Sequence, residues 1–237
     1  RALSRMIEKG TGIPALTIDT DGTKLYDDGE KKTWKELFKK FAVEKDVESG
    51  RIGIIGATPL EFGGIYEEDF LKKYFAGKGF SKVVCYGDAV KEAAAAEKNI
   101  VVSPAGIAAA KYLQQKFGTP YELFCPPEII PEWKEKKEQV AGLLNVEELS
   151  EKKILIVHQQ VLANTLREEF ISANINVASW FMMNKEQKKE QDILFKEEDD
   201  WITYIKENEY DIIIADSLLK KAVPFYKGEW YDLPHFA

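Results

Sequence analysis

The 237-residue sequence contains little cysteine and little histidine, with two residues of each. Two cysteines are too few for a disulfide-rich secreted fold, and at positions 85 and 125 they cannot form a CxxC pair. A reduced, cytoplasmic setting is therefore expected. Because an iron–sulfur cluster held within one chain usually takes four thiolates, we expect this chain alone to bind none.

Long apolar runs and an excess of positive charge are also missing. No apolar run approaches the roughly 20 residues that a membrane-spanning helix needs. The first residues, RALSRMIEKG, lack the apolar core of a signal peptide. The net charge of −7 argues against nucleic acid, whose binding favours a basic face. We expect neither a membrane nor a nucleic acid as partner.

Several motifs that carry chemistry are absent as well. The sequence has no GxxxxGK[ST] phosphate-binding loop, no GxSxG nucleophile elbow and no HExxH zinc-binding helix. The segment Gly53-Ile54-Ile55-Gly56 lacks the remaining glycine of a dinucleotide-binding fingerprint. Motifs therefore name no catalytic residue.

The stretch 99–127 gives the clearest structural prediction. It contains an apolar, β-branched run at 100–102, apolar residues at helical spacing over 104–117, and a second apolar run at 121–124. Ser103 suits the N-cap of the helix, with a proline at the first helical position. A strand, a helix and a strand with such short connections predict a parallel sheet.

The same alternation recurs along the chain. Further apolar runs typical of buried strands lie at 51–56, 82–86, 153–158, 176–182 and 210–215. We also expect an alanine-rich helix over 89–98 and a helix over 34–44 that Thr33 caps. The alternation predicts an α/β fold with Rossmann-like open parallel sheets in two lobes, as part of a larger multi-domain chain.

Four segments are expected from these runs. Residues 1–50 are interpreted as the end of a first α/β domain, and 51–130 as a Rossmann-like α/β domain. Residues 131–151 form a charged helical linker, and 152–237 form a second, incomplete Rossmann-like domain. Because the first residue is arginine and the opening residues are typical of the end of a helix, we expect a piece of a longer protein.

Polar residues at strand ends are the candidate site residues. Open parallel sheets bind ligands outside the carboxyl ends of their strands. The ligand-pocket candidates are Thr58, Ser103, Cys125, His158 and Asp216. We expect them near the wall of a crevice between the two lobes, where helix N-termini would provide a rim suited to an anionic ligand. No metal-binding set is predicted.

Each candidate also has a structural interpretation. Ser103 and Asp216 can be N-caps of the helices that follow them. His158 can be a structural residue, because no second metal ligand is evident beside it. Cys125 can react or bind a metal if it is exposed, but a single thiol can equally be inert. The facing surfaces of the two lobes can also be covered by a missing domain.

Several short segments together form a family pattern. They are Asn99–Pro104 with the alanine-rich helix after it, Lys116–Tyr121, Gly12–Pro14 with a Thr20–Gly22 turn, Arg51–Gly56, Lys152–Val157, and Tyr210–Asp216 with a later Pro224-Phe225 step. In these segments the chain resembles the nitrogenase component 1 family. That family includes the molybdenum–iron protein subunits, the scaffolds that mature their cofactor, and the dark-operative protochlorophyllide reductases.

The resemblance implies an oxidoreductase that acts at a metal cluster or a tetrapyrrole. Its electrons would come from an ATP-driven iron–sulfur reductase, and its partners would be that iron protein and a homologous subunit. An iron–sulfur cluster or metallocofactor is then expected in the full-length protein. Two departures speak against a true nitrogenase: Val102 stands near the position of the family's cofactor-binding cysteine, and Cys125–Glu128 replaces a glycine-containing segment.

Two functions of different classes follow. The first is a redox enzyme subunit, of which this chain is the middle. The second is a non-redox metallocofactor or small-molecule binding or scaffold module. Spaced cysteines upstream of this chain would favour the enzyme, and their absence would favour the binding module.

Overall fold

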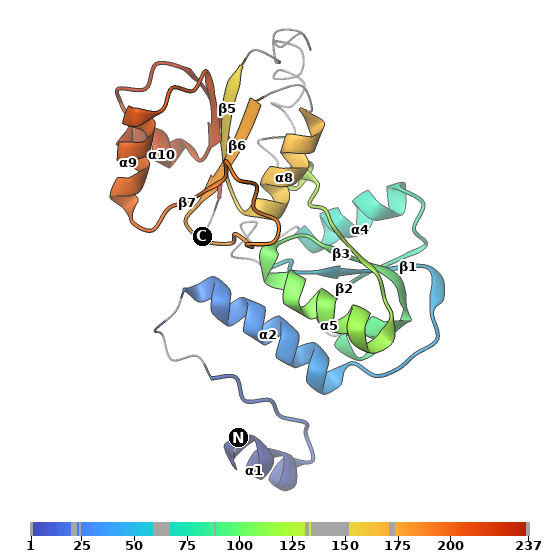
Figure 1. Cartoon of the computed structure of the whole chain (residues 1–237). Coiled ribbons are helices and arrows are strands. Elements are labelled where there is room, and N and C mark those ends of the chain that lie inside the picture. The colour runs from blue at the N-terminus through green and yellow to red at the C-terminus, as the bar shows by residue number, and fades with distance from the viewer. Residues whose placement is uncertain are drawn as a thin grey trace. The chain divides into compact units, whose positions relative to one another are not determined.

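The computed structural model describes residues 2–19, 23, 25–58, 67–87, 89–130, 133, 152–170 and 174–235. Strands and helices alternate along this part of the chain (Figure 1). Within it, no helix combines the length and the apolar character that crossing a membrane requires. The helical linker expected over 131–151 lies outside the described residues except for Trp133, which is buried.

The elements of the first half of the chain are α1 (Ala2–Thr11), α2 (Tyr26–Phe41), β1 (Glu48–Ile55), α4 (Glu67–Gly77), β2 (Lys82–Cys85), β3 (Ala96–Val101), α5 (Ile107–Phe117) and β4 (Tyr121–Leu123). Those of the second half are β5 (Lys153–Val157), α8 (Gln160–Glu169), β6 (Asn174–Ser179), β7 (Ile193–Leu194), α9 (Glu198–Glu207), β8 (Ile212–Ala215), α10 (Ser217–Ala222) and β9 (Glu229–Asp232). Short 3-10 turns occupy Val90–Ala95, Pro104–Gly106 and Pro127–Ile129.

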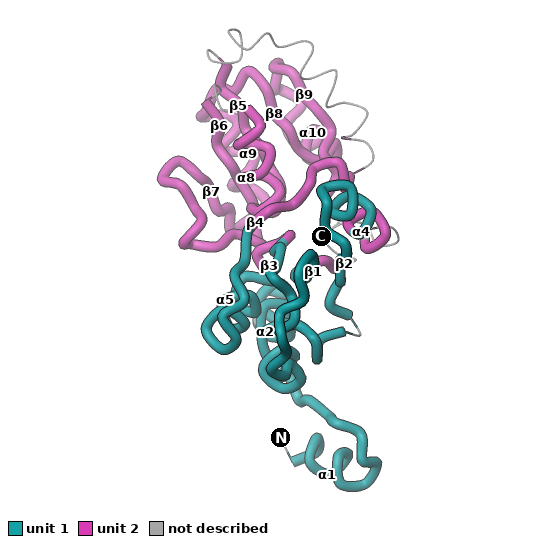
Figure 2. Tube along the Cα trace, turned by 90° about the vertical axis from the view of Figure 1, so that its right-hand side faces the viewer, with its two compact units in different colours: residues 1–56, 72–101, 105–122 teal, residues 57–71, 102–104, 123–237 magenta. Residues whose placement is uncertain are grey.

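The chain divides into two compact units, coloured separately in Figure 2. Unit 1 comprises residues 1–56, 72–101 and 105–122, and unit 2 comprises residues 57–71, 102–104 and 123–237. Each unit contains one sheet.

The first sheet has the strand order β2-β1-β3-β4, and β1 pairs in parallel with both β2 and β3. Residues 51–55 of β1 are all buried, as expected for a central strand that is covered on both faces. Helices α2 and α5 lie side by side over this sheet (Figure 1). Gly118 ends α5 in the left-handed conformation, as its sequence position predicts.

The second sheet has the order β7-β6-β5-β8-β9, and all of its neighbouring strands are parallel. Helices α8 and α9 lie on opposite faces of it (Figure 1). Alternate residues of the central strands, such as Leu155 and Ile213, point to the same face and pack with Trp201 and Ile205 of α9. Parallel sheets with flanking helices confirm the predicted α/β class.

Two sequence predictions of helices are wrong in detail. The alanine-rich segment forms a 3-10 turn and then β3, because residues 98–101 pair with β1 and the alanines at 93–96 are buried. Tertiary pairing overrides the helix propensity of alanine here. Helix α2 begins at Tyr26 rather than after Thr33, whose hydroxyl donates to the carbonyl oxygen of Gly29 at 2.8 Å inside the helix.

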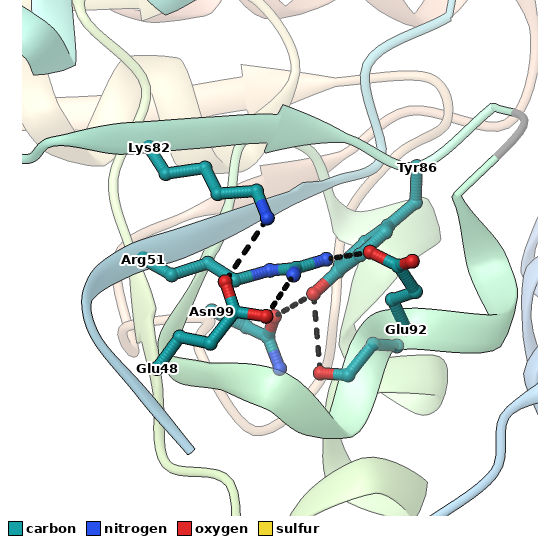
Figure 3. Close-up of polar contacts among 7 residues, drawn as sticks. Glu48, Arg51, Lys82, Tyr86, Glu92 and Asn99 are labelled. Atoms are coloured by element: carbon teal, nitrogen blue, oxygen red, sulfur yellow. Dashed lines mark hydrogen bonds and ion pairs between the residues drawn. The ribbon is translucent and has the colours of Figure 1, made fainter. Parts of the chain in front are cut away.

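A polar network surrounds β1 in unit 1 (Figure 3). The guanidinium of Arg51 is 1% exposed and contacts the carboxylates of Glu48 at 2.9 Å and Glu92 at 2.7 Å. Lys82 of β2 contacts the same Glu48 at 3.0 Å. Both carboxylates lie at the surface, so Arg51 is buried while its partners reach solvent. The network thereby satisfies a charge that would be costly to bury alone.

Gly53 has a packing role in β1. The Tyr86 hydroxyl lies 3.1 Å from the side-chain oxygen of Asn99, and burial raises the pKa of Tyr86 (Figure 3). A Cβ atom on Gly53 would lie 2.1 Å from that hydroxyl oxygen, so only glycine lets the Tyr86 ring lie against β1. This contact, rather than nucleotide binding, explains the glycine.

We predict that Gly53→Ala lowers the free energy of unfolding by about 2 kcal/mol, because Tyr86 must leave its position beside Asn99. Gly77→Ala is the matched control, since a Cβ there meets nothing within 4 Å. The control should change stability by less than about 1 kcal/mol. Urea unfolding measures both, and equal stabilities of the two variants would contradict the packing described for Tyr86.

Candidate functional site

The strand order of the second sheet creates a switch point. The chain runs from β5 outward through β6 and β7, and then returns to the other side of β5 as β8. Open α/β sheets bind ligands outside the carboxyl ends of the strands at such a point. His158 directly follows β5 and Asp216 directly follows β8. Two of the predicted site residues therefore flank the switch point of unit 2.

A cavity of about 180 Å³ lies at this edge of the sheet. Its walls come from the segments after β5, β6, β8 and β9 and from the start of α10. The lining residues are Val157, His158, Ser179, Trp180, Phe181, Asp216, Leu218, Leu219 and His235. Both histidines of the chain are among them.

His158 has the geometry of a neutral hydrogen-bond acceptor. Its side chain is 1% exposed, and Nε2 lies 3.2 Å from the carbonyl oxygen of Pro234. A carbonyl can only accept, so Nε2 carries the hydrogen. Nδ1 is buried and forms no well-aligned hydrogen bond among the described residues, while the backbones of Pro234 and Gln159 both lie close enough to the ring to oppose the lowering of its pKa. Burial, with the neighbouring His235 second, holds the pKa of His158 well below its ordinary value.

Asp216 fixes the opposite wall of the cavity. Its Oδ1 accepts from the backbone N–H of Leu218 at 2.7 Å, which confirms the predicted N-cap of α10. Its Oδ2 accepts from the backbone N–H of His235 at 3.2 Å. The same carboxylate therefore caps a helix and anchors the segment that carries the second histidine.

His235, Trp180 and Phe181 are site residues that the sequence did not predict. The ring of His235 lies 4.3 Å from that of His158 and stacks on Phe181 at 5.4 Å, measured between ring centroids. Trp180 and Phe181 follow β6 at the same edge of the sheet. The expected strand 176–182 includes both aromatic residues, but β6 ends at Ser179, so Trp180 and Phe181 lie at the strand end instead of within the strand. Nothing in the sequence marks His235 beyond its being the second histidine.

Gln159 follows His158 directly and holds the turn after β5. Its side chain is completely buried. The side-chain oxygen accepts from the N–H of Val161 at 2.8 Å and caps α8, while Nε2 donates to the carbonyl oxygen of Val102 at 2.8 Å within unit 2. These two bonds fix the turn between β5 and α8 and hence the position of the His158 backbone.

The other three predicted residues do not line this cavity. Thr58 and Ser103 follow β1 and β3, the strands at the switch point of the first sheet. The Thr58 hydroxyl is buried without a hydrogen-bond partner among the described residues. Ser103 is buried and precedes the turn Pro104–Gly106, so α5 begins later than predicted, at Ile107. The crevice between the lobes stays a prediction.

Cys125 is fully buried rather than exposed. Its backbone N–H donates to the Thr165 hydroxyl at 3.2 Å. Burial from solvent favours the inert interpretation of this thiol.

The chain's own residues do not fit an iron–sulfur cluster. Cys85 lies in β2 of unit 1, whereas Cys125 belongs to unit 2. In the part of the chain that the structure describes, no group of three or more His, Cys, Asp or Glu side chains is placed to hold a metal. A cluster within one chain usually takes four thiolates.

The fold is similar to solved structures of nitrogenase Cp1. One, at pH 5, has a TM-score of 0.62 at 13% identity and covers 99% of this chain and 62% of that chain. Another, at pH 6.5, has a TM-score of 0.55 at 12% identity and covers 88% and 58%. The chain thus spans about three fifths of the length of these matches.

No protein-family model matches the sequence, and no curated protein matches it significantly. At identities this low, structural similarity shows the fold alone. The chain has a nitrogenase-like α/β fold.

We predict that burial of His158 causes the free energy of unfolding to decrease as the pH falls below about 6.5, which is the ordinary pKa of histidine. The unfolded chain then binds a proton that the folded state resists, because the folded-state pKa is lowered. Above that pH the neutral His158 makes its full contribution to the free energy of unfolding. Below it, the contribution decreases by at most about 1.4 kcal/mol per pH unit.

Urea unfolding of wild type and His158→Gln at about pH 7.5 and about pH 5.5 measures this effect. The carboxylates titrate in both proteins, so the difference between them isolates His158. Wild type should lose more stability than the variant on acidification. Equal losses would contradict a buried, neutral His158.

Proposed function

We propose that the chain is part of a nitrogenase-component-1-like oxidoreductase, and that its second unit supplies a small-molecule pocket at the switch point. The complete protein would reduce a substrate at a metal cluster or tetrapyrrole. It would take electrons from an ATP-driven iron–sulfur reductase and associate with a homologous subunit. The cluster and its ligands would lie in parts of the protein outside this chain.

One observation carries the pocket. The strand order brings His158 and Asp216 to the same end of the sheet, where both line one cavity. Ligands of open α/β folds bind at this position. The nitrogenase-like fold supports the proposed oxidoreductase activity of the complete protein by structural analogy.

The residues of the pocket have distinct roles in this proposal. His158 accepts a hydrogen bond from the ligand through Nδ1, since Nε2 is held by Pro234. Asp216 keeps the wall in place through its two backbone contacts. Phe181, stacked on His235, excludes water from the inner surface. Pre-organised walls of this kind lower the cost of ordering on binding.

A non-redox binding or scaffold module is the second candidate. The observation in its favour is that the cavity lining contains imidazoles, a carboxylate and aromatic rings but no thiol. Those groups bind and orient a ligand without exchanging electrons. Both proposed functions use the same pocket, and they differ in whether the complete protein converts a substrate.

We predict that His158→Phe in the full-length protein lowers the occupancy of a co-purified small molecule about tenfold, because the ring volume is kept while the acceptor is lost. Native mass spectrometry after anaerobic purification measures that occupancy. Gln191→Ala, an exposed position of the same unit, is the control and should keep full occupancy.

A second measurement separates the two candidates. Bound iron and sulfide, together with ATP-dependent oxidation of the iron–sulfur reductase, would support the oxidoreductase. A bound small molecule without that turnover would support the scaffold. Full occupancy in His158→Phe would count against the pocket in either case.

A further inference from the structure

A second, larger cavity adjoins the first in unit 2. Its volume is about 790 Å³, and it shares four wall residues with the smaller cavity: Trp180, Phe181, Leu218 and Leu219. Trp201 and Ile202 of α9 add further apolar surface. The two cavities therefore form one site, with an inner end at His158 and an outer end beside the start of α9.

The outer end is acidic. Its lining residues include Glu197, Glu198 and Asp199, which carry negative charge, and Lys196, which carries positive charge. All four side chains are exposed to solvent. With three negative groups against one positive group, the rim repels an anion and attracts a cation.

The walls offer hydrogen-bond acceptors while several of their donors are already used. Trp180 donates its indole N–H to the carbonyl oxygen of Glu197 at 3.1 Å, and the hydroxyl of Ser179 donates to the carbonyl oxygen of Phe181. The acidic side chains at the outer end therefore suit a ligand that donates hydrogen bonds and carries positive charge.

We propose that this site binds an organic cation with an apolar or aromatic body and an ammonium group, which gives a ligand class to the pocket of the proposed function and rests on it. The body packs between Trp180 and the leucine pair of α10. The ammonium group lies at the rim with Glu198 and Asp199. The carboxylates favour the ammonium group, while the indole ring and the leucine side chains favour the apolar body.

Three probes of matched shape test the charge: 3-phenylpropylamine, 3-phenylpropanol and 3-phenylpropanoate. Quenching of tryptophan fluorescence in the purified protein reports binding, because Trp180 and Trp201 line the site. The amine should bind about fivefold more tightly than the alcohol, and the carboxylate should bind most weakly. Among the three probes, only the amine should bind more weakly when salt is added.

Two sets of variants locate the binding. The double variant Glu198→Gln, Asp199→Asn should bind the amine about fivefold more weakly and should bind the alcohol as tightly as wild type does. The matched control is Glu190→Gln with Glu209→Gln, two exposed glutamates outside the lining. Leu218→Trp fills the site from an exposed position and should weaken every probe.

The outcomes separate the ligand class from the pocket. If the alcohol or the carboxylate binds as tightly as the amine or more tightly, and Leu218→Trp abolishes that binding, the pocket is supported but the preference for a cation is wrong. Binding that Leu218→Trp does not change, or no binding of any probe, would overturn the pocket and the cation together.

Discussion

Parallel pairing of one central strand with neighbours on both sides is the constraint on which this structure depends. β1 pairs with β2 and β3, and β5 pairs with β6 and β8. Parallel neighbours need a crossover, so helices alternate with strands, and the chain must reverse its direction of winding once in each sheet. That reversal brings the ends of β5 and β8, far apart in sequence, to adjacent positions.

The sequence predicts the parts of the site that depend on local pattern. The apolar runs at 153–158 and 210–215 place His158 and Asp216 at strand ends, and the cap at Asp216 follows from the residue type. His235 was not predictable in this way, because its position depends on β9 pairing with β8 and on the Asp216 carboxylate that holds its N–H. The helix predicted over 89–98 is wrong for the same reason. The pairing of β3 with β1 depends on the whole fold, and it outweighs the weak helix propensity of alanine.

The helix ends at this edge of the sheet are capped by side chains of the chain itself, which supports the proposed cationic ligand over the anionic one that the sequence led us to expect. Gln159 accepts from the first turn of α8, Asp216 from that of α10, and α9 has a capping box formed by Glu197 and Asp200. Each cap uses an N–H group that could otherwise bind an anion, and the capping side chains of α9 add negative charge beside the cavity. Sequence alone shows a polar strand end, but which partner satisfies each N–H is decided in the folded chain.

The protonation state of the His158 imidazole decides whether the switch point of unit 2 holds a neutral hydrogen-bond acceptor. At about pH 5.5 an ordinary histidine is mostly charged. The ¹⁵N NMR spectrum of the imidazole rings distinguishes the charged ring from each neutral tautomer. We expect His158 to be neutral at this pH, with its hydrogen on Nε2 and with Nδ1 able to accept a hydrogen bond. A charged His158, or one that carries its hydrogen on Nδ1, would contradict an acceptor site at the switch point.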